Sequence, residues 1–292
     1  METFDYIIVG AGSAGCVLAN RLSADPEVRV CLLEAGGRDW HPYIHLPAGF
    51  MKTFYMKSVN WRYEMEASEG TAGRRIYAPR GKTLGGSSSI NGLVWNRGQA
   101  ADFDHWAQRG NRGWGYRDVL PYFRRIETRP GGDPTYRGSD GPLPVVDLDW
   151  RHPLTEAFIE GCVQNGIPRN PDYNGERQEG VSYVQRNVRN GRRVSAADAY
   201  LHPVKGRPNQ EIRTNAHATG LILEEKRVTG VRYRRGGRMG AAAEVRATRE
   251  VILSGGTYNS PQLLQLSGIG DAEQLRSAGI ECHHELPGVG QN

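Results

Sequence analysis

The apolar positions near the amino terminus predict two short strands with a helix between them. Residues 4–9 form an apolar run that is typical of a buried parallel strand, and residues 28–33 form another. Between them, residues 16–22 carry apolar side chains at helical spacing, and Asp25-Pro26 ends that helix. This strand–helix–strand order indicates an α/β fold.

Apolar patterning returns near the end of the chain. Residues 219–224 and 251–255 predict further strands of the same sheet. Ser260-Pro261 then predicts the start of a helix with proline in its first turn. The sheet is therefore expected to join distant parts of the sequence.

A glycine turn links the first predicted strand to the first predicted helix. Residues 10–15 read GAGSAG, which is the G-x-G-x-x-G pattern of dinucleotide-binding folds. Gly10 would allow the tight turn, Gly12 would let the backbone approach a pyrophosphate, and Gly15 would let helix and strand pack closely. The phosphates would then lie at the positive end of the new helix.

An acidic residue follows the second predicted strand at the position that such folds use for a ribose. Glu34 would accept hydrogen bonds from the ribose hydroxyls, and its charge would repel a 2′-phosphate. Glycine turns with a purely structural role are common, but here the preceding strand, the following helix and the acidic residue all fit a dinucleotide-binding fold. The pattern predicts dinucleotide binding without distinguishing NAD from FAD.

Composition narrows the class of protein. Only 38% of the 292 residues are apolar and 38 residues are glycine, which indicates a loop-rich α/β protein. No apolar run is long enough for a membrane helix, and no signal peptide is recognisable. Four scattered cysteines disfavour a disulfide framework or a thiolate metal site and favour a reduced, cytoplasmic location. The adjacent His283-His284 pair lacks matching ligands, so we expect no metal.

The net charge of +5 does not indicate a nucleic-acid partner. The densest basic run, residues 232–238, lies between two strand-like stretches and is typical of a solvated hairpin turn. A nucleic-acid surface would call for interleaved aromatic side chains and a recognition element, and neither is visible.

A second glycine-rich stretch predicts a loop that faces a ligand. Gly81, Gly85 and Gly86 lead into three consecutive serines, and the apolar, helix-compatible sequence INGLVW follows at residue 90. Such a loop offers backbone and hydroxyl donors to a pyrophosphate. The alternative is an ordinary surface loop, which is what we expect for the polar stretch at residues 129–141.

These stretches resemble a known family. RGKTLGGSSSINGLVWNRG, from residue 80, and GGTYNSPQLLQLSGIG, from residue 255, are similar to the two signatures of the glucose–methanol–choline (GMC) flavin oxidoreductases. WHPYIHLPAGF, DFDHWAQRG and GRRVSAADAYLHPVKGRPN resemble the alcohol- and choline-dehydrogenase branch. The resemblance runs along essentially the whole chain, and it implies a Rossmann-like FAD-binding domain with an incomplete α+β substrate-binding region.

The resemblance also implies the cofactor site. Residues 91–94 would lie against the isoalloxazine ring, and residues 215–218, which include Ala218, would contact adenine. Some oxidases of the family attach the flavin to a histidine where this sequence has Ile90, so we expect dissociable FAD. The expected cofactor-binding residues are Gly10, Gly12, Ser13, Ala14, Gly15, Glu34, Ala35, Arg80, Gly81, Thr83, Leu84, Gly85, Gly86, Ser87, Ser88, Asn91, Gly92, Leu93, Val94, Ala218 and Gly255.

We divide the sequence into three segments on this basis. Residues 1–150 and 213–292 are assigned to the FAD-binding domain, and residues 151–212 to the start of the substrate-binding region. The terminal sequence ELPGVGQN resembles an interior connector of the family. We therefore expect an amino-terminal fragment whose substrate-binding and catalytic half is absent.

The family reaction oxidises a CH–OH group: a base removes the hydroxyl proton and hydride passes to flavin N5. The resemblance places that base, a histidine, beyond the end of this chain, so we expect no catalytic residue here. His41, His45, His105 and His202 are interpreted as structural. A primary alcohol or a choline-like compound is the expected substrate, and the electron acceptor is not identified. Activity would exist only in a longer product or with a complementing carboxyl-terminal chain. The alternatives are a flavin- or nucleotide-binding module without catalysis and, more remotely, an NAD-linked dehydrogenase.

Overall fold

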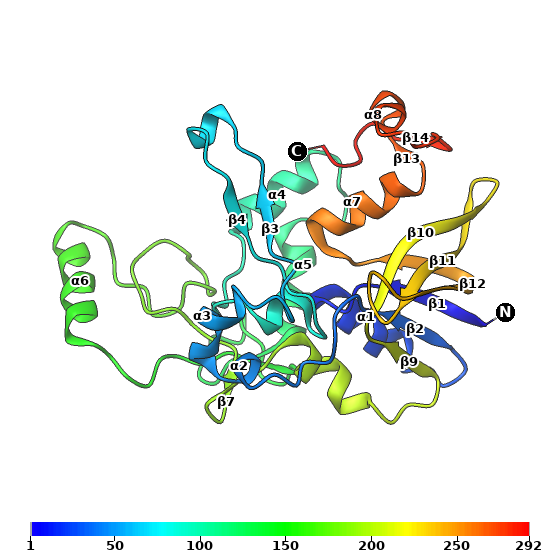
Figure 1. Cartoon of the computed structure of the whole chain (residues 1–292). Coiled ribbons are helices and arrows are strands. Elements are labelled where there is room, and N and C mark those ends of the chain that lie inside the picture. Colours follow the sequence, from blue (N-terminus) through cyan, green and yellow to red (C-terminus); the bar gives the residue numbers. More distant parts are fainter. Residues whose placement is uncertain (1, 292) are drawn as a thin grey trace. The chain divides into compact units, whose positions relative to one another are not determined.

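Strands from the two ends of the sequence meet in one sheet. In the computed structural model, which describes residues 2–291, β1 (Thr3–Val9) pairs in parallel with β2 (Val30–Leu33) on one side and with β12 (Ala241–Leu253) on the other. The full strand order is β10-β11-β12-β1-β2-β9. Figure 1 shows this sheet, with the blue amino-terminal strand lying beside strands from the end of the chain. The predicted α/β sheet is confirmed.

The sheet has a parallel and an antiparallel part. β9 (Gln210–Arg213) extends the parallel part beyond β2, whereas β10 (Ala216–Glu224) and β11 (Arg227–Arg235) form an antiparallel hairpin that pairs with β12. Parallel strands need a crossover, and helix α1 (Ser13–Leu22) supplies it between β1 and β2. The carboxyl ends of β1 and β2 therefore lie at one edge, where folds of this kind bind ligands.

Apolar side chains cover both faces of the central strands. Ile7 and Leu33 belong to a buried cluster with Leu263 of α7 (Gly256–Leu266). Ile8 and Leu32, which point to the opposite face because strand residues alternate, are also fully buried. Burial of each such side chain stabilises the fold by about 1.5–3 kcal/mol.

The described chain divides into two compact units. The first unit comprises residues 1–91 and 195–292 and contains the six-stranded sheet. The second unit comprises residues 92–194. The boundaries after residues 91 and 194 differ from those that we placed after residues 150 and 212, and the assignment of cofactor and substrate roles to the segments stays a prediction.

A buried ion network organises the second unit. The Glu127 carboxylate, at the start of β5 (Glu127–Thr128), is fully buried and accepts hydrogen bonds from Arg97 (2.7 Å) and Arg137 (2.6 Å). Arg137 also pairs with Asp172. Residues 129–141 form a largely exposed loop, as we expected, and the buried Arg137 anchors that loop in the interior of the second unit.

Two local predictions are wrong. Helix α7 begins at Gly256, so Pro261 lies inside the helix instead of in its first turn. The sequence INGLVW is not helical: a short 3₁₀-helix, η3 (Gly86–Ser89), ends before it, and Leu93 has a positive φ of 67°. Both stretches contact other parts of the fold, which overrides local propensity.

The other helices and strands complete the two units. In the first unit they are α2 (Pro42–His45), η1 (Pro47–Gly49), α3 (Phe50–Thr53), β3 (Tyr63–Met65), η2 (Glu69–Thr71), β4 (Ile76–Ala78), the π-helix η4 (Ala197–Leu201), η5 (His202–Val204), β13 (Ile269–Gly270), α8 (Ala272–Ser277) and β14 (His284–Glu285). In the second unit they are α4 (Ala100–Gln108), α5 (Tyr116–Ile126), β6 (Leu143–Pro144), α6 (Pro153–Gln164), β7 (Val188–Arg189) and β8 (Arg192–Arg193).

Candidate cofactor site

A cavity of about 780 Å³ opens in the first unit at the carboxyl ends of β1 and β2. Its volume lies within the range of pockets that hold cofactors and other small ligands. Of the expected cofactor-binding residues, twelve line it: Gly10, Gly12, Ser13, Ala14, Glu34, Ala35, Arg80, Gly81, Gly86, Ser87, Ala218 and Gly255. The structure thus brings together the glycine turn, the acidic residue after β2, the loop at residues 81–89 (the Gly/Ser loop) and the start of α7.

Packing within the protein requires glycine at two of the three glycine positions of this turn. Gly10 has a φ of +100°, and a Cβ there would lie 2.6 Å from the Ser254 carbonyl oxygen. A Cβ at Gly15 would overlap the Gly10 carbonyl oxygen. Both positions therefore need glycine for the fold itself.

Gly12 is different. Its φ is an ordinary −79°, and a Cβ there would meet no protein atom closer than 4.0 Å. Across the cavity floor, a Cβ at Gly86 would come within 2.7 Å of the Gly12 Cα atom. The floor is thus bare backbone on which a ligand can lie, and this fits a dinucleotide pyrophosphate.

Helix α1 points its amino terminus into the cavity. Its N-cap, Gly12, provides no side-chain hydrogen bond, and no acidic residue lies in the first turn. The first N–H groups of an α-helix have no acceptor within the helix, and the helix dipole makes this end positive. Ser13 and Ala14, which line the cavity, therefore present donors suited to a phosphate.

Glu34 is buried beneath the rim. Its Oε2 accepts the Ala11 N–H (2.9 Å) and its Oε1 accepts the Gly36 N–H (2.8 Å). Burial raises the pKa of this carboxyl to about 7, although both N–H groups and the Lys82 ammonium oppose the shift. Each oxygen keeps a lone pair for a further donor.

The Gly/Ser loop contributes fewer free hydroxyls than its sequence predicts. Ser88 donates to the Gly85 carbonyl, and Ser89 donates to the Leu84 carbonyl (2.7 Å). The Ser87 hydroxyl, which accepts the Gly81 N–H (3.0 Å), is the one serine of the three that lines the cavity. Two serines thus shape the loop, and one faces the cavity.

The other expected residues lie elsewhere. Gly15, Thr83, Leu84, Gly85, Ser88 and Asn91 belong to the first unit but do not line the cavity. Gly92, Leu93 and Val94 belong to the second unit.

One wall of the cavity was not foreseen from the sequence. Trp61 and Tyr63 stack with ring centroids 5.7 Å apart, and Tyr63 makes an edge contact with Tyr258. The Arg80 guanidinium lies over the Tyr258 ring at 4.6 Å. Tyr258 stands within the second signature, but the aromatic pair precedes β4 in a stretch with no distinctive sequence pattern.

A histidine also lines the cavity. His217 of β10 packs against Trp61, and its pKa is lowered by burial and by the nearby charges of Lys82, Arg238 and Arg234. The ring is therefore neutral near pH 7.

Comparisons with known proteins show the family to which the chain belongs. Residues 4–292 match the family model for GMC oxidoreductases. The chain is 49% identical over 288 residues to an oxygen-dependent choline dehydrogenase of Sinorhizobium fredii, and 46% identical over 290 residues to an alcohol dehydrogenase [acceptor] of Pseudomonas putida. Each match covers 99% of this chain and 52% of the relative, so the chain spans about half the length of these relatives.

Solved structures show the same fold. The structure of pyridoxine 4-oxidase from Mesorbium loti superposes with a TM-score of 0.92 at 41% sequence identity, covering 97% of this chain and 55% of that one. An FAD-dependent oxidoreductase from Chaetomium thermophilum gives the same TM-score at 30% identity. The chain therefore belongs to the GMC oxidoreductase family and has that family's FAD-binding fold.

Proposed function

We propose that the cavity holds FAD, with the pyrophosphate on the bare floor that Gly12 and Gly86 form together. The observation that carries this proposal is that Gly12 has no steric reason within the protein to be glycine. The first turn of α1 and the Ser87 hydroxyl would bind the phosphates, and the remaining lone pairs of Glu34 would accept the ribose hydroxyls. Residues 216–218 would line the adenine end.

We also propose that the FAD is dissociable. Ile90 is buried against Ile44 and Val59, and an aliphatic side chain cannot form a covalent bond to the flavin. The assignment of residues 91–94 to the isoalloxazine ring rests on the family resemblance alone and stays a prediction.

The reaction that we propose for the whole protein is oxidation of a CH–OH group of a small alcohol or choline-like substrate. The names of the relatives support this class, since they are choline and alcohol dehydrogenases. FAD, when bound, supplies the hydride acceptor, and the residues of this chain supply its binding and orientation. The electron acceptor stays unassigned.

We further propose that this chain alone lacks the base for the reaction and needs a complementing chain. The His41 ring caps α2 by accepting the Tyr43 N–H, and the His45 ring bonds to the Asp39 carbonyl (2.8 Å). His202 is held between two carboxylates, and His217 lies beside the residues proposed for the adenine end. These contacts give His41, His45 and His202 structural roles, and they leave His217 at the adenine end of the proposed site.

Addition of a primary alcohol or choline to the FAD-loaded chain under anaerobic conditions tests this division of roles. We expect the visible flavin absorbance to persist, because binding is present without the base. Bleaching of that absorbance would show that the chain contains a working base. Turnover that depends on a nicotinamide cofactor would instead support an NAD-linked dehydrogenase.

A further inference from the structure

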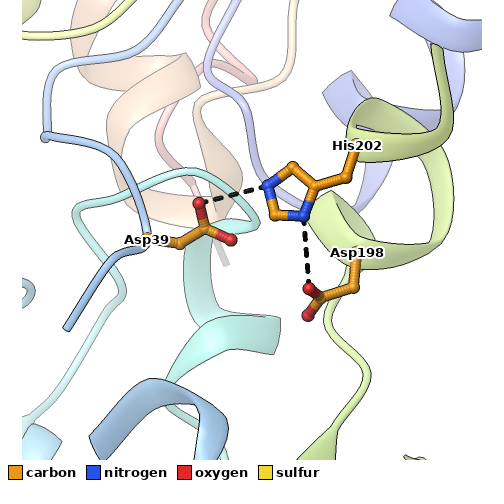
Figure 2. A group of neighbouring side chains, drawn as sticks. All are labelled: Asp39, Asp198 and His202. Atoms are coloured by element: carbon orange, nitrogen blue, oxygen red, sulfur yellow. Dashed lines mark hydrogen bonds and ion pairs between the residues drawn. The ribbon is translucent and has the colours of Figure 1, made fainter. Parts of the chain in front are cut away.

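Away from the cofactor cavity, one histidine bridges two carboxylates (Figure 2). The Nε2 atom of His202 lies 3.2 Å from Asp39 Oδ1, and its Nδ1 atom lies 3.3 Å from Asp198 Oδ1. The Asp39 side chain is 2% exposed, and its Oδ2 atom has no hydrogen-bond partner among the described residues. Because carboxylates only accept, both ring nitrogens can be satisfied together only if the ring carries two protons.

The surrounding charges keep this imidazole protonated. Hydrogen bonds to Asp198 and Asp39 raise the pKa of His202 to about 10, against the opposing effect of burial. Two other titratable groups lie near: the His45 ring, which bonds to the Asp39 carbonyl, and the buried Cys16 thiol of α1, whose pKa both carboxylates help to raise. The cation in this cluster is thus the histidine itself.

The same three side chains are less suited to a metal ion. Their ligand atoms lie within 4.8 Å of one another, but the ring stands between the carboxylates and turns a different nitrogen to each. A metal bound to one ring nitrogen would displace the proton that this nitrogen donates, and the hydrogen bond from that nitrogen to its carboxylate would be lost. The geometry is that of a doubly ion-paired histidine, and we call the group Asp39, His202 and Asp198 the clasp.

One arm of the clasp, residues 36–39, contacts the amino-terminal part of the Gly/Ser loop. Two residues before Asp39, the Gly37 carbonyl accepts the Leu84 N–H (3.1 Å) and the Thr83 hydroxyl (3.1 Å). A Cβ at Gly36 would overlap the Lys82 carbonyl, so the two backbones are in direct contact. This arm therefore fixes residues 82–84.

The other arm, residues 195–198, contacts the carboxyl-terminal part of the same loop. The second Asp198 oxygen accepts the backbone N–H (2.9 Å) and the hydroxyl (2.8 Å) of Ser195. The next residue, Ala196, donates its N–H to the Ser88 hydroxyl (2.9 Å), and Ser88 in turn donates to the Gly85 carbonyl. This arm therefore fixes residues 85–88.

The loop between the arms is the one that lines the cavity. Gly85 donates its N–H to the Ala11 carbonyl in the glycine turn (2.8 Å), and Gly86 and Ser87 form part of the cavity wall. We propose that His202 is a positioning residue: it ties residues 37–39 to residues 195–198 and so holds the Gly/Ser loop against the glycine turn in the arrangement that receives the cofactor phosphates. The consequence for the cofactor rests on the proposed FAD site, whereas the clamping of the loop does not.

Hydrogen exchange of the full chain without added FAD tests the clamping directly. His202→Gln leaves the buried Asp39 carboxylate without a cationic partner, and we expect amides in residues 83–88 and 195–198 to exchange about tenfold faster. The exposed His284 provides the control His284→Gln, which should change nothing. Unchanged exchange in both segments, or a uniform acceleration along the whole chain, would overturn the proposal.

FAD affinity tests the consequence for the cofactor. We expect His202→Gln to weaken FAD binding about tenfold at pH 7, and His202→Arg, which keeps a permanent charge with several donors, to restore most of it. The clasp needs the protonated ring. As the pH rises through about 10, the FAD affinity of the wild type should therefore fall relative to that of the His202→Arg variant.

The outcomes separate the two proposals. If the wild type binds FAD and the His202→Gln and His202→Arg variants bind it equally well at every pH, the positioning role is wrong and the proposed function stands. If the wild type binds no FAD, the proposed function fails, and the exchange experiment still decides whether the clasp holds the loop. Should His202→Gln not fold, the double variant His202→Gln/Asp39→Asn, which removes the uncompensated buried charge, is used in its place.

Discussion

At the residue scale, the glycines of the first turn have two kinds of role. Gly10 and Gly15 are needed by the fold, because a side chain would be strained or would overlap the backbone. Gly12 meets no such obstacle, and its side chain would enter the cavity. Substitutions at the two kinds of position should therefore separate folding from ligand binding.

Gly12→Ala should leave the fold intact and weaken FAD binding. We expect a loss of less than about 1 kcal/mol in the free energy of unfolding, since a helix N-cap tolerates alanine at modest cost. FAD affinity should fall at least tenfold because the new methyl group occupies the pyrophosphate floor. Denaturant titration and flavin fluorescence measure the two effects.

Gly10→Ala is the matched comparison. Its φ of +100° and the 2.6 Å approach to the Ser254 carbonyl predict a loss of stability of about 2 kcal/mol or more. Equal effects of the two substitutions on folding would contradict the distinction between them.

Glu34 should make the stability of the FAD-free chain depend on pH. Its folded-state pKa of about 7 lies above its ordinary value of 4.5, so the folded state favours the protonated form. Its contribution to the free energy of unfolding is therefore largest below pH 4.5 and falls as the pH rises through 7. Between these limits the loss should amount to about 3 kcal/mol at most.

Urea unfolding of the wild type and of Glu34→Gln across this pH range measures that contribution. The difference between their free energies of unfolding should become less favourable to the wild type as the pH increases. A difference that stays constant with pH would show that Glu34 titrates at its ordinary pKa.

At the scale of elements, buried ion pairs organise the second unit, whereas apolar packing organises the sheet of the first unit. The Glu127 carboxylate has no exposure and holds both Arg97 and Arg137. Trp95 Nε1–H also donates to it (2.7 Å). Removing one partner of a buried ion pair leaves an uncompensated charge, which is far more costly than losing a surface pair.

Glu127→Gln should lower the free energy of unfolding of the second unit by about 3–5 kcal/mol. Asp147→Asn is the control, because Asp147 pairs with Arg129 but is 58% exposed, and its loss should cost less than about 1 kcal/mol. Thermal unfolding followed by tryptophan fluorescence compares them. Equal destabilisation by the two variants would mean that the buried network contributes no more than a surface pair.

The sequence predicted some elements well and others poorly, for physical reasons. β1, α1 and β2 were predictable because buried parallel strands are continuous apolar runs and the glycine turn marks the crossover. Pro261 inside α7 was not, since proline lacks the N–H that a helix interior uses and is therefore expected in the first turn. The Glu127 network was equally hidden, because charged residues far apart in sequence give no periodic signal.

At the scale of the molecule, the sequence predicted most of the cavity but not all of its wall. The glycines and Glu34 could be predicted from the sequence because close approach of the backbone and ribose binding each demand a particular residue type. Trp61 and Tyr63 come from a connecting segment, and their place in the wall depends on the tertiary fold. The same holds for His202, whose partners are 163 and four residues away in the chain.

The location of the protein in the cell stays a prediction. All four cysteines are free thiols in the structure, and burial raises the pKa of the Cys31 thiol to about 12. Among the residues described, no helix combines the length and apolar character that crossing a bilayer requires.

The central claim is that this chain binds FAD in the cavity of its first unit. Titration of the purified full chain with FAD, followed by quenching of flavin fluorescence, tests it most directly. We predict saturable binding of one FAD per chain, weakened by Gly12→Ala, with all the flavin released as free FAD on acid denaturation. No saturable binding, or binding unaffected by Gly12→Ala, would contradict the claim.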